Sequence, residues 1–293
     1  MAEPFAAGAS NRVSIVEMAP RDGLQNEKVL IDTQAKIRLV DMLSACGFER
    51  IEVTSFVSPK WVPQLADAAD VMAGIARRPG VRYAVLTPNM KGFEAALAAK
   101  ADEVAIFASA SEGFSQHNIN CSIAESIERF RPVAEAARQQ GIPVRGYVSC
   151  VVECPYDGAV APESAASVAA RLKDLGCYEI SLGDTIGRGT PEAVDRMLSA
   201  VLATMPATKL AGHFHDTSGR ALDNIGVALE RGIRVFDASV GGLGGCPYAP
   251  GAKGNVDTLM VDQYLKARGF ETGLGEDALE QASVFARGLR SST

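Results

Sequence analysis

Short apolar runs alternate with longer stretches in which apolar residues recur every three to four positions. The short runs end in polar or glycine-containing loops, which is typical of buried strands. The longer stretches have the spacing of helices with one buried face. Strands are expected over residues 13–18, 50–54, 81–86, 103–108, 144–151, 178–182, 210–215 and 234–240. Helices are expected over residues 33–45, 67–77, 89–99, 122–140, 162–175 and 191–205, then through 221–229, from about 256, and over 274–289.

Eight strand–helix units in about 260 residues indicate an α/β fold, the (β/α)₈ TIM barrel, which typically has ~250 residues. An open doubly wound sheet would carry a glycine-rich fingerprint after its first strand. Here that loop reads APRDGLQNE, with a single glycine, so the barrel is favoured. We expect a flexible tail over residues 1–12 and one catalytic domain over 13–293. This domain would include a glycine-rich lid after the last strand and an extra C-terminal helical segment. Pro132 is expected to kink or split the helix over 122–140.

Composition narrows the classes of partner and the compartment. The net charge of −6 argues against nucleic acid as a partner, and no apolar run approaches the ~20 residues of a membrane span. The six cysteines are too scattered for a disulfide framework, so we expect reduced thiols in a cytoplasmic protein.

Two of the three histidines, His213 and His215, stand one residue apart at the end of an expected strand. Side chains at i and i+2 of a strand share a face, so both imidazoles could bind one metal ion. Function in a TIM barrel lies on the loops after the strands. There, Asp22 and Asn255 would join the histidines in a mixed oxygen and nitrogen set, which suits Mg²⁺ or Mn²⁺. The third histidine, His117, is expected on a loop surface.

The loop over residues 240–255, VGGLGGCPYAPGAKGN, contains six glycines and Cys246. It matches neither a P-loop nor a dinucleotide fingerprint, and it could be a plain surface connection. The functional interpretation is a mobile lid that carries a thiol over the site, as a proton donor or a nucleophile. Two acidic residues at strand ends also have two interpretations each. Asp184 could act chemically or cap the following turn, and Glu52 could act chemically while paired with Arg21.

Several segments together resemble the hydroxymethylglutaryl-CoA lyases, a family of the TIM-barrel metallolyase superfamily that also contains isopropylmalate and homocitrate synthases. The Arg-Asp-Gly and His-x-His elements mark only the superfamily. The SFVSPKWVPQ segment and the GGLGGCPYAPGA loop are more specific for the lyases. The matching segments are APRDGLQNE, IEVTSFVSPKWVPQ, LTPNMKGFEAA, NINCSI, RGYVSCVVECPYDG, CYEISLGDTIGRGTP, HFHDT and VGGLGGCPYAPGAKGN.

The resemblance implies an enzyme that cleaves (S)-3-hydroxy-3-methylglutaryl-CoA into acetyl-CoA and acetoacetate in leucine degradation, with one Mg²⁺ or Mn²⁺ per subunit of a homodimer. It implies that Arg21 stabilises an enolate and that Cys246 returns a proton. Glu52, Asp184 and His213 match the family's proton-transfer residues, with the base left open among them. The metal ligands it implies are Asp22, His213, His215 and Asn255. Contacts to the substrate or coenzyme A are expected from Gln25, Lys28, Ser55, Lys60 and Ser181.

Four alternatives stay open at this point. Phe214 and Ser218 differ from close lyase relatives, which leaves room for a longer 3-hydroxy-3-alkylglutaryl-CoA, such as one with an isohexenyl tail. A condensing synthase of the same superfamily is less favoured, because those usually carry His-x-His-Asn-Asp where this chain reads HFHDT. A metal-dependent hydrolase is disfavoured, since amidohydrolase barrels place His-x-His after the first strand. The fourth alternative is a metal-binding barrel without catalytic activity.

Overall fold

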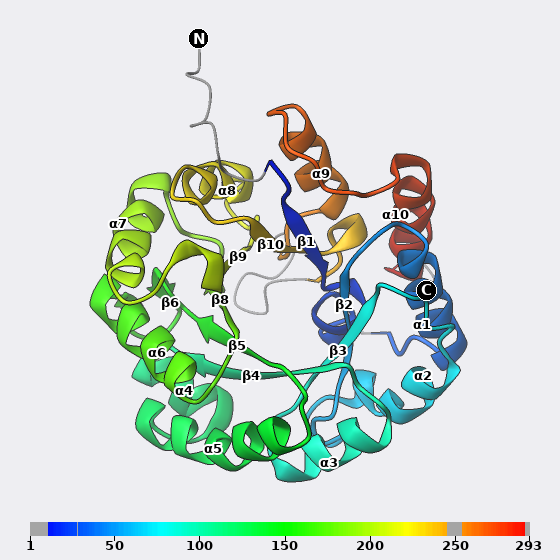
Figure 1. The fold of residues 1–293 in the computed structure, drawn as a ribbon, viewed down its shortest axis with the longest axis horizontal. Helices are drawn as coiled ribbons and strands as arrows, with labels where there is room; N and C mark the ends of the chain where they lie inside the picture. The colour runs from blue at the N-terminus through cyan, green and yellow to red at the C-terminus, as the bar shows by residue number, and fades with distance from the viewer. Residues whose placement is uncertain (1–10, 28, 245–253, 291–293) are drawn as a thin grey trace.

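A computed structural model describes residues 11–27, 29–244 and 254–290. Eight parallel strands close into a barrel, and helices surround it, so the expected TIM barrel is confirmed (Figure 1). The ring order is β1-β10-β9-β8-β5-β4-β3-β2. These strands are β1 (Ser14–Glu17), β2 (Arg50–Ser55), β3 (Arg82–Leu86), β4 (Glu103–Ser109), β5 (Val144–Ser149), β8 (Glu179–Asp184), β9 (Leu210–Phe214) and β10 (Val235–Ala238).

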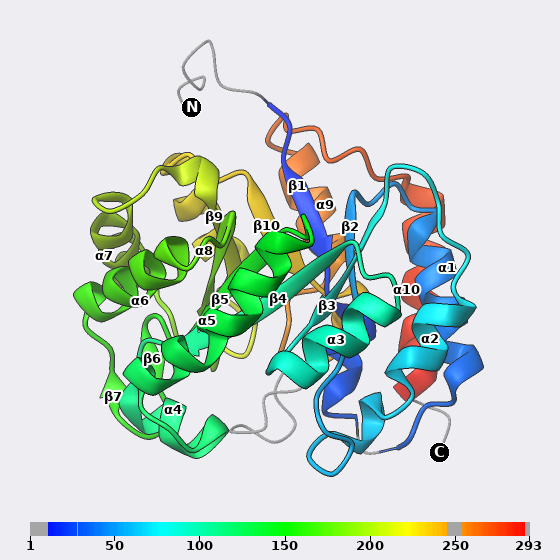
Figure 2. The ribbon, with the colours of Figure 1, turned by 60° about the horizontal axis from the view of Figure 1, so that its bottom comes forward.

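The outer helices form the second layer and bury their apolar faces against the strands. Figure 2 shows them flanking the barrel on both sides. They are α1 (Thr33–Ser44), α2 (Ala68–Gly74), α3 (Met90–Ala98), α4 (Glu112–Ile119), α5 (Ile123–Gln139), α6 (Pro162–Asp174), α7 (Pro191–Leu202), α8 (Ala221–Glu230), α9 (Thr258–Lys266) and α10 (Glu276–Arg290). The expected extra C-terminal segment is α10, which lies beside α1. None of the described helices is both long and apolar enough to cross a membrane.

The structure corrects two expectations about the segment after β4. Residues 112–119, expected as a loop, form α4, because the Ser111 hydroxyl caps it by accepting a bond from the Phe114 N–H. His117 is therefore on a helix, although it is exposed as expected and stacks on Tyr156. Pro132 does not split the following helix, since α5 runs unbroken past it and Pro132 faces solvent.

Shorter elements were not anticipated from the sequence pattern. A hairpin of β6 (Glu153–Cys154) and β7 (Gly158–Ala159) follows β5. A π-helical turn, η1 (Ala19–Gly23), follows β1, and a 3₁₀ turn, η4 (Val240–Gly242), follows β10. Two further 3₁₀ turns are η2 (Pro63–Leu65) and η3 (Ala207–Lys209). Because η1 and η4 follow neighbouring strands, they bring residues from the two ends of the chain together at one end of the barrel.

The barrel interior contains both apolar and charged side chains. Val16, Met18, Leu86, Ala105 and Tyr147 pack together. Buried arginines pair with buried carboxylates across strands. These pairs are Arg50 with Glu179, Arg145 with Glu179, and Arg145 with Asp237. Burying a charge is costly unless it is paired, so each of these groups depends on its neighbours for its place in the fold.

Candidate active site at the barrel mouth

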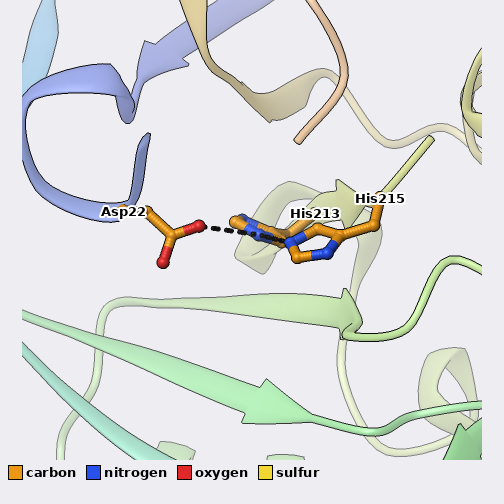
Figure 3. Close-up of side chains that lie close together, drawn as sticks. All are labelled: Asp22, His213 and His215. Carbon is orange, nitrogen blue, oxygen red and sulfur yellow. Dashed lines mark hydrogen bonds and ion pairs between the residues drawn. The ribbon is translucent and has the colours of Figure 1, made fainter. Parts of the chain in front are cut away.

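The expected metal ligands converge at the ends of strands from opposite ends of the chain. Asp22 lies in η1 just after β1, whereas His213 is on β9 and His215 directly follows it. Figure 3 shows the Asp22 carboxylate pointing towards the two imidazoles. One donor atom from each of the three residues lies within 4.8 Å of the other two, so they could hold a metal ion.

The distances within this group fit a single small cation. The Nε2 atoms of His213 and His215 are 3.2 Å apart, and the Asp22 Oδ2 atom is 3.8 Å from the Nε2 of His213. Two ligand atoms at about 2.1 Å from one ion, and at right angles to each other, are about 3.0 Å apart. The two imidazole nitrogens are therefore spaced as neighbouring ligands in an octahedral site would be.

Asn255 closes the fourth side of this group. It is buried, and its side-chain Nδ2 donates to the Asp22 Oδ2 at 2.8 Å. A half-turn of the amide would put its oxygen in the same position, since the two ends of an amide are nearly equal in size. The backbone of Asn255 forms a β-bridge with that of His215. Gly244 packs directly against the side-chain amide of Asn255, since a Cβ on residue 244 would lie 2.7 Å from its Nδ2.

The protonation states of Asp22 and His215 suit metal binding at neutral pH. Burial alone would raise the pKa of Asp22, but the nearby charge of Arg21, followed by the two histidines, holds it well below its usual range. Burial first, and then the neighbouring His213, lowers the pKa of His215 to about 4. A carboxylate and a neutral imidazole are the forms that coordinate a metal.

Arg21 and Glu52 form a buried ion pair beside the metal donors. The Arg21 Nε donates to Glu52 Oε1 through a short bond, and its Nη1 donates to Asp22 Oδ1 at 2.5 Å. Tyr147 donates its hydroxyl to the other Glu52 oxygen at 2.5 Å. Among the described residues these bonds use Nε and Nη1 of Arg21, which leaves Nη2 to donate to a bound molecule.

Two residues of this constellation were missed by the sequence interpretation, Tyr147 and Asp237. Both stand in apolar strands and point into the barrel, where Asp237 Oδ2 lies 3.1 Å from His213 Nδ1. The sequence does mark both positions, because each is a polar residue in a short strand of mainly apolar residues. It does not show which face of the strand each one occupies, because strands of a parallel sheet are buried on both faces.

Other predicted site residues lie apart from the metal donors or are already bonded. The Asp184 carboxylate accepts from the Arg188 and Gly189 N–H groups, as a turn cap would. Ser181 and Ser55 are fully buried. The Ser181 hydroxyl donates to Asp237, and the Ser55 hydroxyl has no hydrogen-bond partner among the residues that the structure describes.

The expected coenzyme contacts are only partly visible. Gln25 lines a cleft of about 220 Å³ whose rim carries Trp61, a side chain that is 86% exposed. Lys60 is exposed next to Trp61. Lys28 and the lid residue Cys246 lie outside the described residues.

The family model described as HMGL-like matches residues 12–285, which is nearly the whole chain. The chain belongs to the HMGL-like family. One relative in this family is the 3-hydroxy-3-isohexenylglutaryl-CoA/hydroxy-methylglutaryl-CoA lyase of Pseudomonas aeruginosa, which is 60% identical over 271 residues, covering 92% of this chain and 90% of the relative.

Solved structures of HMGL-like proteins have the same architecture. The HMG-CoA lyase from Brucella melitensis superposes with a TM-score of 0.95 at 67% identity, covering 96% of this chain and 99% of the other. The HMG-CoA lyase from Acinetobacter baumannii, solved in complex with coenzyme A and 3-methylmalate, has a TM-score of 0.91 at 38% identity, covering 99% and 93%. The resemblance noted from the sequence motifs is thereby confirmed.

A single methyl group at Gly23 is expected to disturb this site. A Cβ there would lie 2.7 Å from the Ser239 Oγ and 2.8 Å from the Leu243 Cβ, so η1 would have to move away from η4. Overpacking of this kind typically costs ~1–3 kcal/mol of unfolding free energy. We expect Gly23→Ala to lower the unfolding free energy by this amount, seen as a lower urea midpoint, and to weaken Mn²⁺ binding, because Asp22 is the adjacent residue.

The matched control is Gly288→Ala in α10, where no atom of the described part of the chain lies within 4 Å of the added Cβ. An alanine in a helix is up to ~1 kcal/mol more favourable than a glycine, so this variant should be neutral or slightly more stable. Equal urea midpoints for Gly23→Ala and the unmodified protein would show that η1 is not tightly held.

Proposed function

We propose that this chain cleaves (S)-3-hydroxy-3-methylglutaryl-CoA into acetyl-CoA and acetoacetate. The observation that carries the proposal is the placement of the Arg21–Glu52 pair beside the Asp22, His213 and His215 donors. The names of the similar lyases support the same reaction. No co-reactant is needed, because the proton lost from the C3 hydroxyl is matched by one added to the departing acetyl group.

The proposed ligands for a divalent cation are Asp22, His213, His215 and the side-chain oxygen of Asn255, with one Mg²⁺ or Mn²⁺ per subunit. Oxygen and imidazole donors without a thiolate favour these ions. When bound, such a cation makes a coordinated hydroxyl more acidic and fixes the orientation of the substrate.

Arg21 is the proposed stabiliser of the negative charge that develops as the C2–C3 bond breaks. Its guanidinium is already oriented by Glu52 and Asp22, so no reorganisation is needed when the thioester oxygen becomes an enolate oxygen. Nη2 is the group we assign to that oxygen. The pair also keeps the charges of both Glu52 and Arg21 compensated in a buried position.

Proton transfer needs a base at the hydroxyl and an acid at the new carbanion. Glu52, Asp184 and His213 are the proposed candidates for the base. Of these, Glu52 is held by Arg21 and Tyr147, and Asp184 by backbone N–H groups, so each would exchange an existing bond to act. The acid we propose is Cys246.

Coenzyme A is the proposed carrier of the acyl group, supported by the coenzyme in the Acinetobacter lyase structure. We propose contacts from Gln25, Lys28 and Lys60, and we place the protein in the cytoplasm as a homodimer. In the described part of the chain, the cysteines at positions 46, 121, 150, 154 and 177 are buried.

The test is the stoichiometry of the reaction. Purified protein with Mg²⁺ and the thioester should form acetyl-CoA and acetoacetate in equal amounts. Hydrolysis to free coenzyme A without acetoacetate would contradict the proposal. Condensation of acetyl-CoA with a 2-oxo acid, without cleavage, would instead favour a synthase.

A second candidate substrate is the isohexenyl analogue, because the similar Pseudomonas lyase is named for both compounds. The two thioesters differ only in the tail on C3, so a comparison of kcat/KM on the same preparation distinguishes them. A higher value for the isohexenyl compound would reassign the physiological substrate while leaving the lyase reaction in place.

A further inference from the structure

Asp237 lies behind His213, on the side away from the metal donors. Its Oδ2 atom is 3.1 Å from the Nδ1 of His213, while the Nε2 of the same ring faces Asp22 and His215. Asp237 is on β10, the strand next to β9, and is 2% exposed. The imidazole of His213 therefore stands between a buried carboxylate and the site that would hold a cation.

Asp237 has its own orienting contacts. The Arg145 guanidinium is bonded to both carboxylate oxygens, with Nη2 to Oδ1 at 2.7 Å and Nη1 to Oδ2 at 3.1 Å. The Ser181 hydroxyl donates to the same Oδ2 at 2.7 Å. A two-point contact from a planar guanidinium holds a carboxylate in one plane and in its ionised form.

An ionised carboxylate has no hydrogen to donate, so the hydrogen in the contact with His213 must be on Nδ1. In a neutral imidazole this leaves Nε2 without a hydrogen and with its lone pair directed at Asp22 and His215. Only this tautomer of His213 can coordinate a cation through Nε2 without first losing a proton there.

We propose that Asp237 is a positioning residue, which selects the Nδ1–H tautomer of His213 and aims Nε2 at the metal. Arg145 and Ser181 hold Asp237 in place for this task. The inference deepens the proposed lyase function and rests on it for the identity of the bound cation. The tautomer itself is a property of the metal-free protein and does not depend on activity.

The contacts predict graded effects of two substitutions. Asp237→Ala removes the acceptor, so the tautomer of His213 is no longer selected and Nε2–H becomes populated. Asp237→Asn can keep an oxygen where the three donors meet, so it should retain the tautomer. Partners of this kind typically contribute 10–100-fold to metal affinity, so we expect Asp237→Ala to raise the Kd for Mn²⁺ by this factor and Asp237→Asn by less.

The matched control is Glu179→Gln. Glu179 is also a buried carboxylate bonded to Arg145, at 2.8 Å from its Nε, but it has no bond to His213. If Asp237 only neutralised Arg145, the two changes would have similar consequences. We expect Glu179→Gln to lower stability while leaving the His213 tautomer and the Kd for Mn²⁺ unchanged.

The experiment is a two-bond ¹H–¹⁵N correlation spectrum of metal-free, ¹⁵N-histidine-labelled protein, together with a Mn²⁺ titration followed by electron paramagnetic resonance. The chain has only three histidines, so the resonances are assigned with His117→Ala and His215→Ala. The Nδ1–H form of His213 in the unmodified protein, lost in Asp237→Ala, supports the proposal.

Two results would overturn it. One is the Nε2–H form of His213 in the unmodified protein, a measurement that needs no change at Asp237 and so decides the matter even if those variants do not fold. The other is an equal loss of Mn²⁺ affinity in Asp237→Ala and Glu179→Gln. Absence of Mn²⁺ binding in the unmodified protein would instead contradict the proposed metal-dependent function.

Discussion

Removal of divalent cations is expected to reduce acetoacetate formation to the background rate, and Mg²⁺ or Mn²⁺ is expected to restore it. A bound cation would draw its ligands from Asp22, His213 and His215, whose donor atoms lie together, and from the adjacent Asn255 amide. A cation that polarises a substrate oxygen lowers the activation barrier by several kcal/mol. At 1.36 kcal/mol per tenfold, the loss should be about 10³-fold or more.

The measurement is an acetoacetate assay before and after treatment with EDTA, followed by addition of each cation in turn. His215→Ala should bind Mn²⁺ weakly and show little recovery. His117→Ala is the matched control, because that histidine is exposed on α4 and stacks on Tyr156. It should recover fully. Undiminished cleavage in protein shown to be free of metal would rule out the proposed mechanism.

Arg21→Lys is expected to lower kcat by about 10²–10³-fold, the usual cost of removing one preorganised donor from an anion site. A lysine keeps the positive charge but cannot bond to Glu52, Asp22 and a substrate oxygen at once, since its ammonium is a single point. The buried Glu52 would also lose its arginine partner. We therefore expect the substitution to act mainly on kcat, with a smaller change in KM.

The structure offers a matched control for this substitution. Arg131 on α5 pairs with Glu128 on the exposed surface. Arg131→Lys therefore also removes a guanidinium that is bonded to a glutamate, but away from the barrel mouth. Surface pairs contribute little, and activity should be unchanged. A Mn²⁺ titration of Arg21→Lys separates the effect on charge stabilisation from any disturbance of Asp22. Near-normal turnover in Arg21→Lys would remove Arg21 from the reaction.

The barrel and the metal donors were predictable because both depend on short-range regularities. Each strand–helix unit is visible as a change of hydrophobic period, and the barrel rule then assigns strand ends to one mouth. This is how Asp22 and His213, almost two hundred positions apart, were expected to meet. The α4 helix was missed because its sequence has little amphipathic pattern, and its start depends on the Ser111 cap.

What could not be predicted depends on pairing between strands. Asp237, Arg145 and Ser181 come from three strands, and only the closed barrel shows that they share one hydrogen-bonded group. The expected split of the helix at Pro132 was wrong for a different reason. A proline removes one hydrogen bond on one side of a helix, and on an exposed face the neighbouring carbonyl can bond to water instead.

The cleft beside Gln25 gives the protein an optical reporter of its own. Trp61 is the only tryptophan in the chain, and its indole is almost fully exposed on the rim of that cleft. All intrinsic tryptophan fluorescence therefore comes from this one spot. A ligand that covers the ring would shift the emission to shorter wavelength, whereas one held only at the metal donors would leave it unchanged. Unlabelled protein can thus report where along its surface a thioester lies.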